Sequence, residues 1–237
     1  MNDANKKRLL KDVVDILKHP LTNDGIFYKH DENNMLHGYA LIIGPSDTIY
    51  NYGYYFFEFN YPKDYPYSPP KVKYYTNNHN IRFHPNLYRN GKVCLSLLNT
   101  WRGEQWTSCQ TIKTILLNLI TLFHNKPLLN EPGITEKYKF FENYNNIIRY
   151  HNFKTAIYEI VNKENCLNLY NIFSNEIKST FEKNKKEIIE NLKLLKIAHE
   201  GETLYLDVPL YNMFKIPLNY RELYHIFRLT FLSDKNN

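Results

Sequence analysis

The chain has 237 residues, of which 43% are hydrophobic, and a formal net charge of +6 at pH 7. This composition supplies enough apolar side chains for a sizeable core, which excludes an intrinsically disordered protein. No apolar run approaches the roughly 20 residues that a membrane-spanning helix needs, and the N-terminal segment lacks the apolar stretch of a signal peptide. We therefore expect a soluble intracellular protein, cytoplasmic or nuclear, without a membrane partner.

The positive charge is spread along the whole sequence. Residues 1–133 and 134–237 each carry a small excess of lysine and arginine, and acidic residues flank both of the densest basic stretches, 6–8 and 183–186. A nucleic-acid-binding protein usually gathers its basic residues on one face or in one run. We therefore expect no nucleic-acid partner.

The three cysteines lie far apart in the sequence and form no Cys-x-x-Cys pair: Cys94, Cys109 and Cys166. Their number and spacing argue against a structural zinc site and against a disulfide framework. We expect no bound metal and a reducing compartment.

The first elements in chain order are one helix and four strands. Apolar residues recur at three- and four-residue spacing from 9 to 17, which predicts an amphipathic helix that ends before Pro20. Strands are predicted at residues 26–29, 37–43, 48–60 and 71–76. Short turn segments between them favour an antiparallel meander. The aromatic run in the third strand is typical of a buried strand; a base-stacking platform is the alternative.

A long irregular stretch, 77–106, follows the strands, and loops of this length are usually functional. A second helix is predicted over 112–123, with Thr107 or Ser108 as its N-cap. Beyond residue 133 the pattern is helical: 136–162 and 165–197, then loops marked by Gly201 and Pro209, and a last helix over 220–231. We predict an α+β fold with a domain of residues 1–133 and a helical extension of residues 134–237 packed on it.

The irregular stretch contains the segment HPNLYRNGKVCLSLL, residues 84–98. Asn90-Gly91 predicts a tight turn with positive φ at both residues, which brings Asn86 and Cys94 within reach of each other. A thiol beside an amide donor suits acyl transfer, in which the amide stabilises the oxyanion. His84 precedes a proline and is read as structural, so the site lacks a base to activate water and would hold a thioester. From the spacing alone, a buried structural Cys94 remains the alternative.

These residues resemble the active-site segment of ubiquitin-conjugating (E2) enzymes: a His-Pro-Asn triplet, then Gly-x-Val-Cys-Leu and a downstream tryptophan, here Trp106. The preceding NYPKDYPYSPPKV, residues 60–72, is similar to the family's Tyr-Pro-x-x-Pro-Pro-x-Val segment. The Thr-Trp-x-Gly insertion after the cysteine and NEPG at 130–133 are similar to the large Z-type members, which carry a C-terminal extension.

The resemblance implies the UBC fold and a reaction. An activating enzyme (E1) passes ubiquitin to Cys94 as a thioester, and a lysine of a protein substrate, usually recruited by an E3 ligase, accepts it. Asn86 matches the triplet asparagine, with a role in oxyanion stabilisation or loop support, and His84 matches the structural histidine. Glu131 lies where many members have an aspartate that positions or deprotonates the incoming lysine. The chain itself needs no cofactor, because the E1 uses the ATP.

The resemblance also implies two partner surfaces. Lys6, Lys7 and Lys11 lie on the helix that contacts the E1. The loops that contact E3 ligases hold Tyr67, Trp106 and Ser108. The usual Ser-Pro-Ala after the tryptophan is Thr-Ser-Cys here, which leaves the choice of E3 open, and the common aspartate two residues after the cysteine is Ser96.

Two alternatives to a ubiquitin carrier remain open. The same fold could act on a ubiquitin-like modifier, because no residue in the sequence identifies the modifier directly. A non-catalytic ubiquitin-binding module is the other alternative, although such variants lack the cysteine.

Overall fold

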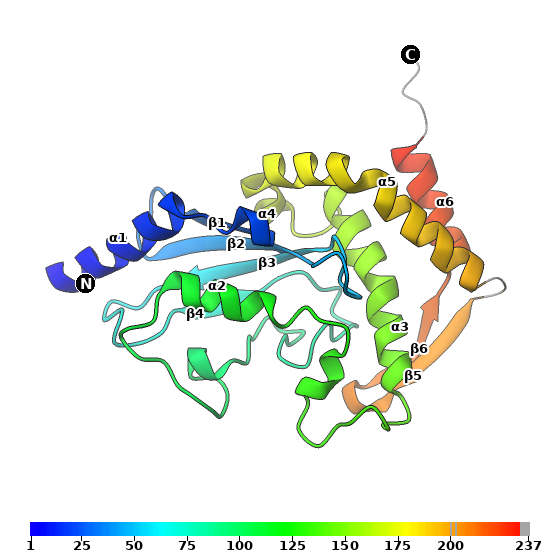
Figure 1. Cartoon of the computed structure of the whole chain (residues 1–237), viewed down its shortest axis with the longest axis horizontal. Coiled ribbons are helices and arrows are strands. Elements are labelled where there is room, and N and C mark those ends of the chain that lie inside the picture. The colour runs from blue at the N-terminus through cyan, green and yellow to red at the C-terminus, as the bar shows by residue number, and fades with distance from the viewer. Residues whose placement is uncertain (200, 202, 233–237) are drawn as a thin grey trace, which may run out of the picture.

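A four-stranded antiparallel sheet forms the centre of the molecule in the computed structural model, which describes residues 1–199, 201 and 203–232 (Figure 1). The strands pair in chain order: β1 Ile26–His30, β2 His37–Ile43, β3 Tyr54–Asn60 and β4 Lys71–Tyr74. The predicted meander is confirmed. The third strand begins six residues later than expected, because the residues before it form turns. The Thr48 N–H and hydroxyl donate to the Pro45 carbonyl, and the Asn51 N–H donates to the Thr48 carbonyl.

Helix α2, Ile112–Ile120, lies below this sheet in Figure 1, and helix α1, Asp3–Lys18, lies at its left-hand end, in contact with α2 and β1. Asn2 caps α1, since its side chain accepts a hydrogen bond from the Asn5 backbone N–H. Thr111 caps α2 through a capping box with Thr114. The predicted cap at Thr107 or Ser108 was therefore wrong: residues 107–110 form a separate turn before the helix begins.

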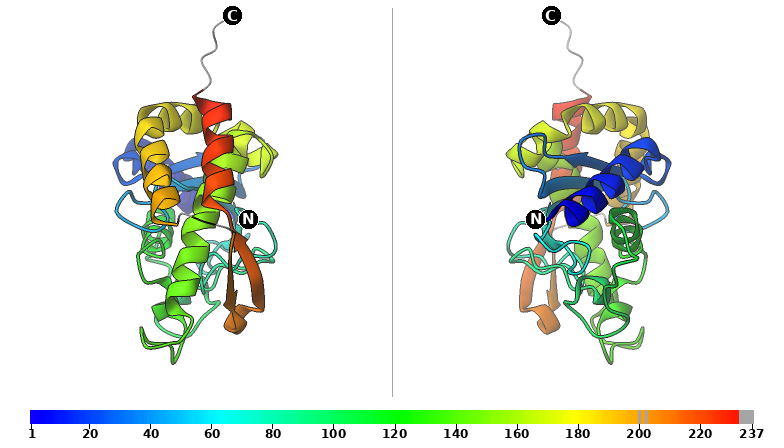
Figure 2. Two further views of the ribbon diagram at one scale, coloured as in Figure 1. Left: turned by 90° about the vertical axis from the view of Figure 1, so that its right-hand side faces the viewer. Right: turned by 90° about the vertical axis from the view of Figure 1, so that its left-hand side faces the viewer.

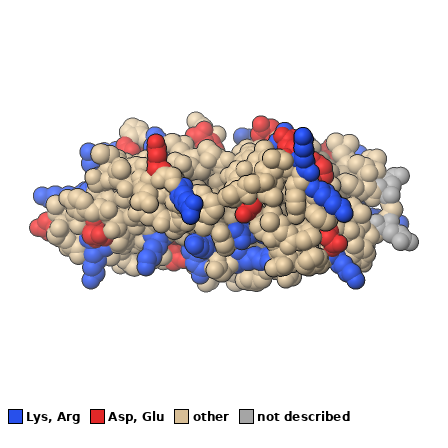
Figure 3. Space-filling view, turned by 90° about the horizontal axis from the view of Figure 1, so that it is seen from below, with Lys and Arg blue, Asp and Glu red and all other residues tan. Residues whose placement is uncertain are grey.

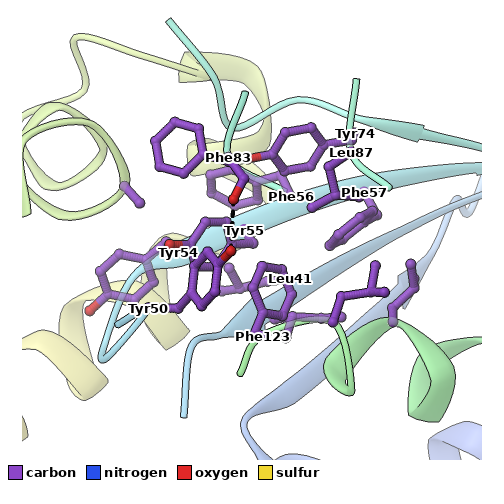
Figure 4. Packing of buried hydrophobic residues seen from close by; sticks show 14 of the residues in the cluster. Leu41, Tyr50, Tyr54, Tyr55, Phe56, Phe57, Tyr74, Phe83, Leu87 and Phe123 are labelled. Carbon is purple, nitrogen blue, oxygen red and sulfur yellow. Dashed lines mark hydrogen bonds between the residues drawn. The ribbon is translucent and has the colours of Figure 1, made fainter. Parts of the chain in front are cut away.

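The aromatic residues of β3 are buried on both faces of the sheet (Figure 4). Tyr55 stacks on Phe123 beyond α2, with ring centroids 4.3 Å apart. Its neighbour Phe56 packs on the opposite face against Phe173 of the extension, at 6.1 Å. Because successive strand residues point to opposite faces, this run builds two layers of core. It is not an exposed base-stacking platform.

The extension contributes four α-helices among the described residues: α3 Phe141–His151, α4 Leu167–Ile172, α5 Ser174–Ala198 and α6 Tyr220–Phe231. A π-helical stretch, Asn152–Glu159, continues α3. Lys29 on β1 donates to the carbonyl of Ile172 at 2.8 Å and pairs with Glu176 at 2.8 Å, so α4 and α5 contact the upper face of the sheet. The helical character of the extension is confirmed. Its boundary at residue 133 stays a prediction.

The extension also contains a β-hairpin, where the sequence predicted only loops. Strands β5 Leu204–Val208 and β6 Met213–Leu218 pair antiparallel through a short turn, Pro209–Tyr211. Pro217 can lie in β6 because this strand pairs on one side only. The hairpin runs beside α3 (Figure 2), where the Asn143 side chain donates to the Asp207 carbonyl at 3.1 Å.

Charged side chains of both signs are interspersed on the face shown in Figure 3, in keeping with the spread of charge along the sequence. No described helix combines the length and the apolar character needed to cross a bilayer.

Candidate active site

A tight turn at Asn90-Gly91 sets the geometry around Cys94. Tyr88 N–H donates to the Lys92 carbonyl at 2.9 Å, and Leu87 bridges to Val93, so the two arms of the turn run antiparallel. Gly91 has φ +89°, whereas Asn90 does not adopt positive φ, contrary to the predicted conformation. A Cβ at Gly91 would lie 2.8 Å from the Tyr74 carbonyl oxygen, so only glycine fits this close approach.

Asn86 and Cys94 face each other across these arms. The Cys94 N–H donates to the Asn86 carbonyl at 2.8 Å, and the Asn86 side-chain amide donates to the Cys94 carbonyl at 2.6 Å. The proximity that the turn predicts is therefore present. In this conformation the Asn86 amide supports the backbone of the cysteine through one of its two N–H groups.

His84 stabilises the segment that enters the turn, residues 84–88. Its side chain is completely buried, and Nδ1 accepts the Asn86 backbone N–H at 3.0 Å. Burial lowers the pKa of His84 well below its ordinary value, and nearby His124 and Arg82 lower it further. The imidazole is therefore neutral and engaged with the backbone, which suits a structural role and not that of a general base.

The thiol of Cys94 lies beneath the segment that follows it. The residue is only 2% exposed, and Sγ lies 3.5 Å from the Thr100 carbonyl oxygen. The Thr100 hydroxyl in turn accepts the Leu95 N–H and donates to the Val93 carbonyl, which folds residues 95–100 over the cysteine. A groove of about 650 Å³ runs beside this segment, with Val93 and Thr100 in its wall.

The segment after α2 approaches the site through Asn130. Its side-chain amide donates to Asn86 Oδ1 at 3.4 Å, and its own Oδ1 contacts His124 Nε2 at 3.2 Å. The neighbouring Glu131 turns toward the extension, where it accepts a 2.6 Å hydrogen bond from the Tyr211 hydroxyl. The structure therefore brings His84, Asn86 and Cys94 together, and it joins Glu131 to the hairpin.

Sequence reasoning missed Asn130, although it lies within the NEPG motif, and it missed Tyr211. The Arg82 guanidinium stacks on Tyr88, 3.5 Å from the ring centroid, and lies 5.2 Å from the Tyr211 ring. Tyr211 comes from the hairpin turn, far along the chain, so no local pattern could place it here.

The predicted E1-binding lysines are exposed on α1. Lys6, Lys7 and Lys11 all face solvent on this helix. Leu10, Val14 and Leu17 are also exposed, because α1 buries the neighbouring apolar residues instead. The three lysines therefore lie on a surface of α1 that also exposes apolar side chains.

The predicted E3-binding residues differ in exposure. Tyr67 is 73% exposed and Ser108 is exposed, whereas Trp106 is 8% exposed and donates its indole N–H to the Pro66 carbonyl at 2.6 Å. Trp106 is therefore a buried link between its own loop and the loop that holds Pro66 and Tyr67. The Arg8 guanidinium donates to the carbonyls of Ser108 and Gln110, which places α1 beside the second loop.

The fold and the site together define a class of protein. An N-terminal helix, a four-stranded meander and an asparagine-supported cysteine before the second helix characterise the ubiquitin-conjugating enzymes. A sequence model of the family described as "Ubiquitin-conjugating enzyme" matches residues 8–158, and this chain belongs to that family.

Curated proteins named "Ubiquitin-conjugating enzyme E2 Z" are similar to this chain. The Danio rerio protein is 41% identical over 157 residues, which cover 65% of this chain and 47% of that protein. The Homo sapiens protein is 40% identical, with 65% and 44% covered. The match therefore spans about half of these relatives. In the structure of human ubiquitin-conjugating enzyme E2 G1, the similarity covers 48% of this chain and 90% of that one, at 34% identity and a TM-score of 0.43.

Proposed function

We propose that this chain is an E2 enzyme that accepts ubiquitin from an E1 as a Cys94 thioester and transfers it to a lysine of a protein substrate, usually with an E3 ligase. The observation that carries the proposal is the reciprocal pair of hydrogen bonds between Asn86 and Cys94. This pair fixes the backbone of the cysteine while leaving its sulfur free of any covalent partner.

Both steps exchange one acyl bond for another. In charging, the Cys94 sulfur attacks the carbonyl carbon of the E1 thioester; the new C–S bond forms, the old one breaks, and the E1 sulfur takes up a proton as the Cys94 thiol loses one. In discharge, a neutral lysine amine attacks the Cys94 thioester. A C–N bond forms, the C–S bond breaks, and the amine releases its proton to a nearby base or to water. These steps need no cofactor on this chain, since the E1 consumes the ATP.

The surroundings of Cys94 favour aminolysis over hydrolysis. A cysteine hydrolase pairs its thiol with a histidine base. His84, which is near in the chain, is buried, neutral and engaged with the Asn86 N–H. A thioester on Cys94 would therefore persist until an amine arrives. A free thiol of this kind suits the reducing environment of the cytoplasm or nucleus.

A charging assay tests the proposal. The protein is incubated with E1, ATP and ubiquitin and run on a gel without reductant. We expect a band shifted by one ubiquitin that thiol reductant removes and that Cys94→Ala abolishes. Cys94→Ser should give an adduct that resists reductant, because an oxygen ester replaces the thioester.

Parallel reactions with other E1 enzymes and ubiquitin-like modifiers separate the alternatives. Charging by one of those modifiers alone would keep the mechanism and change the cargo. Failure with all of them would leave a ubiquitin-binding module.

A further inference from the structure

Tyr211 brings the C-terminal extension into contact with the segment that follows α2. Its hydroxyl donates to Glu131 Oε2 at 2.6 Å, and its carbonyl accepts a hydrogen bond from Arg89 Nη2 at 2.6 Å. Its ring lies 5.7 Å from the ring of Tyr144 on α3 and 5.2 Å from the Arg82 guanidinium. The hydroxyl, carbonyl and ring are thus all engaged, which fixes the side chain in one place.

The hydroxyl of Tyr211 remains a hydrogen-bond donor throughout the physiological range. Burial raises its pKa above the ordinary value, and the hydrogen bond to Glu131 raises it further. A protonated phenol can only donate to the carboxylate, so it occupies one carboxylate oxygen and leaves the other available. The bond therefore selects one orientation of the Glu131 side chain.

Glu131 is adjacent in the chain to Asn130, whose side chain contacts Asn86 beside Cys94. Asn130 contacts the Asn86 side chain, and Asn86 donates to the Cys94 carbonyl. A continuous series of contacts therefore leads from the hairpin to the cysteine. This series of contacts connects the Glu131 carboxylate, through the adjacent Asn130, to the backbone around the cysteine.

We propose that Tyr211 is a positioning residue for aminolysis: it holds the Glu131 carboxylate in the orientation that receives the incoming lysine ammonium. The inference rests on the proposed function, because it assigns the extension a role at the Cys94 thioester. Tyr211 acts through Glu131 and does not itself touch the reacting atoms. Charging by the E1, which involves no amine, does not require it.

The test compares Tyr211→Phe with the unchanged protein, after charging with ubiquitin and removal of ATP. We expect normal thioester formation, discharge to free lysine slowed about tenfold at low lysine, as for the loss of a hydrogen bond to a charged group, and a higher half-saturating lysine concentration. Discharge by hydroxylamine, a neutral nucleophile with no ammonium to receive, should be unchanged. Tyr205→Phe is the matched control, since Tyr205 lies on the same hairpin and is 63% exposed.

A double-mutant cycle locates the effect at Glu131. In a Glu131→Ala background, Tyr211→Phe should slow lysine discharge no further. Additive losses, an equal slowing with hydroxylamine, or wild-type lysine kinetics in Tyr211→Phe would each overturn the inference. Failure of the unchanged protein to form any thioester would instead overturn the proposed function, so the two failures are distinct.

Discussion

Asn86 and Cys94 hold each other through two hydrogen bonds, one between their backbones at 2.8 Å and one from the Asn86 side chain at 2.6 Å. The second bond uses one of the two N–H groups of the side-chain amide. The resting site therefore uses Asn86 to shape the loop around the cysteine.

Replacing Asn86 with alanine removes the side-chain hydrogen bond to the Cys94 carbonyl. We expect the free energy of unfolding to fall by about 1 kcal/mol, the typical net value of one hydrogen bond, together with slower discharge to lysine. Denaturant unfolding and single-turnover discharge measure the two effects. Unchanged stability with lost discharge would contradict loop support and would assign the amide to the reaction itself.

Stability should depend on pH through the buried histidines. Burial lowers the pKa of His151 to about 3, and Lys154 adds to this. An unfolded histidine has a pKa of about 6.5. Between these values the unfolded chain binds more protons, so the stability that His151 provides is complete above about pH 6.5 and declines as the pH falls toward 3.

Replacing His151 with glutamine should reduce this pH dependence. We expect the slope of unfolding free energy between about pH 4 and 6 to decrease by about 1.4 kcal/mol per pH unit. His19→Gln, at the exposed end of α1, serves as the control for the loss of a surface histidine. Equal slopes in the His151 variant and the unchanged protein would refute a lowered pKa of His151 in the folded protein.

Tyr67 and Trp106 should respond differently to alanine substitution. Trp106 is buried and bonded to the Pro66 carbonyl, so Trp106→Ala should cost about 3–5 kcal/mol of stability. Tyr67 is exposed, so Tyr67→Ala should leave stability and charging unchanged and reduce only the E3-stimulated discharge. Thermal unfolding and E3 titrations measure these effects. A Tyr67 variant that E3 stimulates normally would remove this residue from the predicted E3 surface.

The exposed lysines of α1 should set the rate of charging. Replacing all three predicted E1-binding lysines with alanine should slow thioester formation several-fold at low salt and leave the melting temperature unchanged, because exposed charges contribute little to stability. The difference should shrink at high salt, where surface charges are screened.

A matched triple variant on α5 provides the control for this experiment. It replaces three exposed lysines there: Lys178, Lys183 and Lys186. Both variants lose the same charge, so an equal slowing would point to net charge and would refute a specific E1 surface on α1.

Much of the sheet and the nucleophile could be predicted from sequence because their signals are local. The alternation and turn residues of β1 to β4 indicate the meander, and the Asn90-Gly91 turn indicates the proximity of Asn86 and Cys94. The expected strand over 48–60 was too long, since residues 48–53 carry aromatic side chains in a turn that packs into the core. Thr111 was overlooked as a cap because hydroxyl residues also precede it.

The extension was harder to predict because distant contacts decide its structure. Pro209 and Pro217 are local signals against a strand, yet β5 and β6 pair with each other and pack beside α3. The hydrogen bond between Tyr211 and Glu131 joins residues 80 positions apart. A periodic pattern of apolar residues cannot predict a contact between residues so far apart in the sequence. The hydrogen bond that joins the extension to the segment after α2 could therefore be found only in the structure.

The most direct test of the account is intact-mass and peptide mapping of the ubiquitin adduct formed with E1 and ATP. We expect one adduct on the unchanged protein and on a Cys109→Ala/Cys166→Ala variant. The same variant with Cys94→Ser should carry an ester-linked ubiquitin whose mapped position is residue 94. An adduct on Cys109 or Cys166, or charging that survives Cys94→Ala, would contradict the central claim that Cys94 is the carrier.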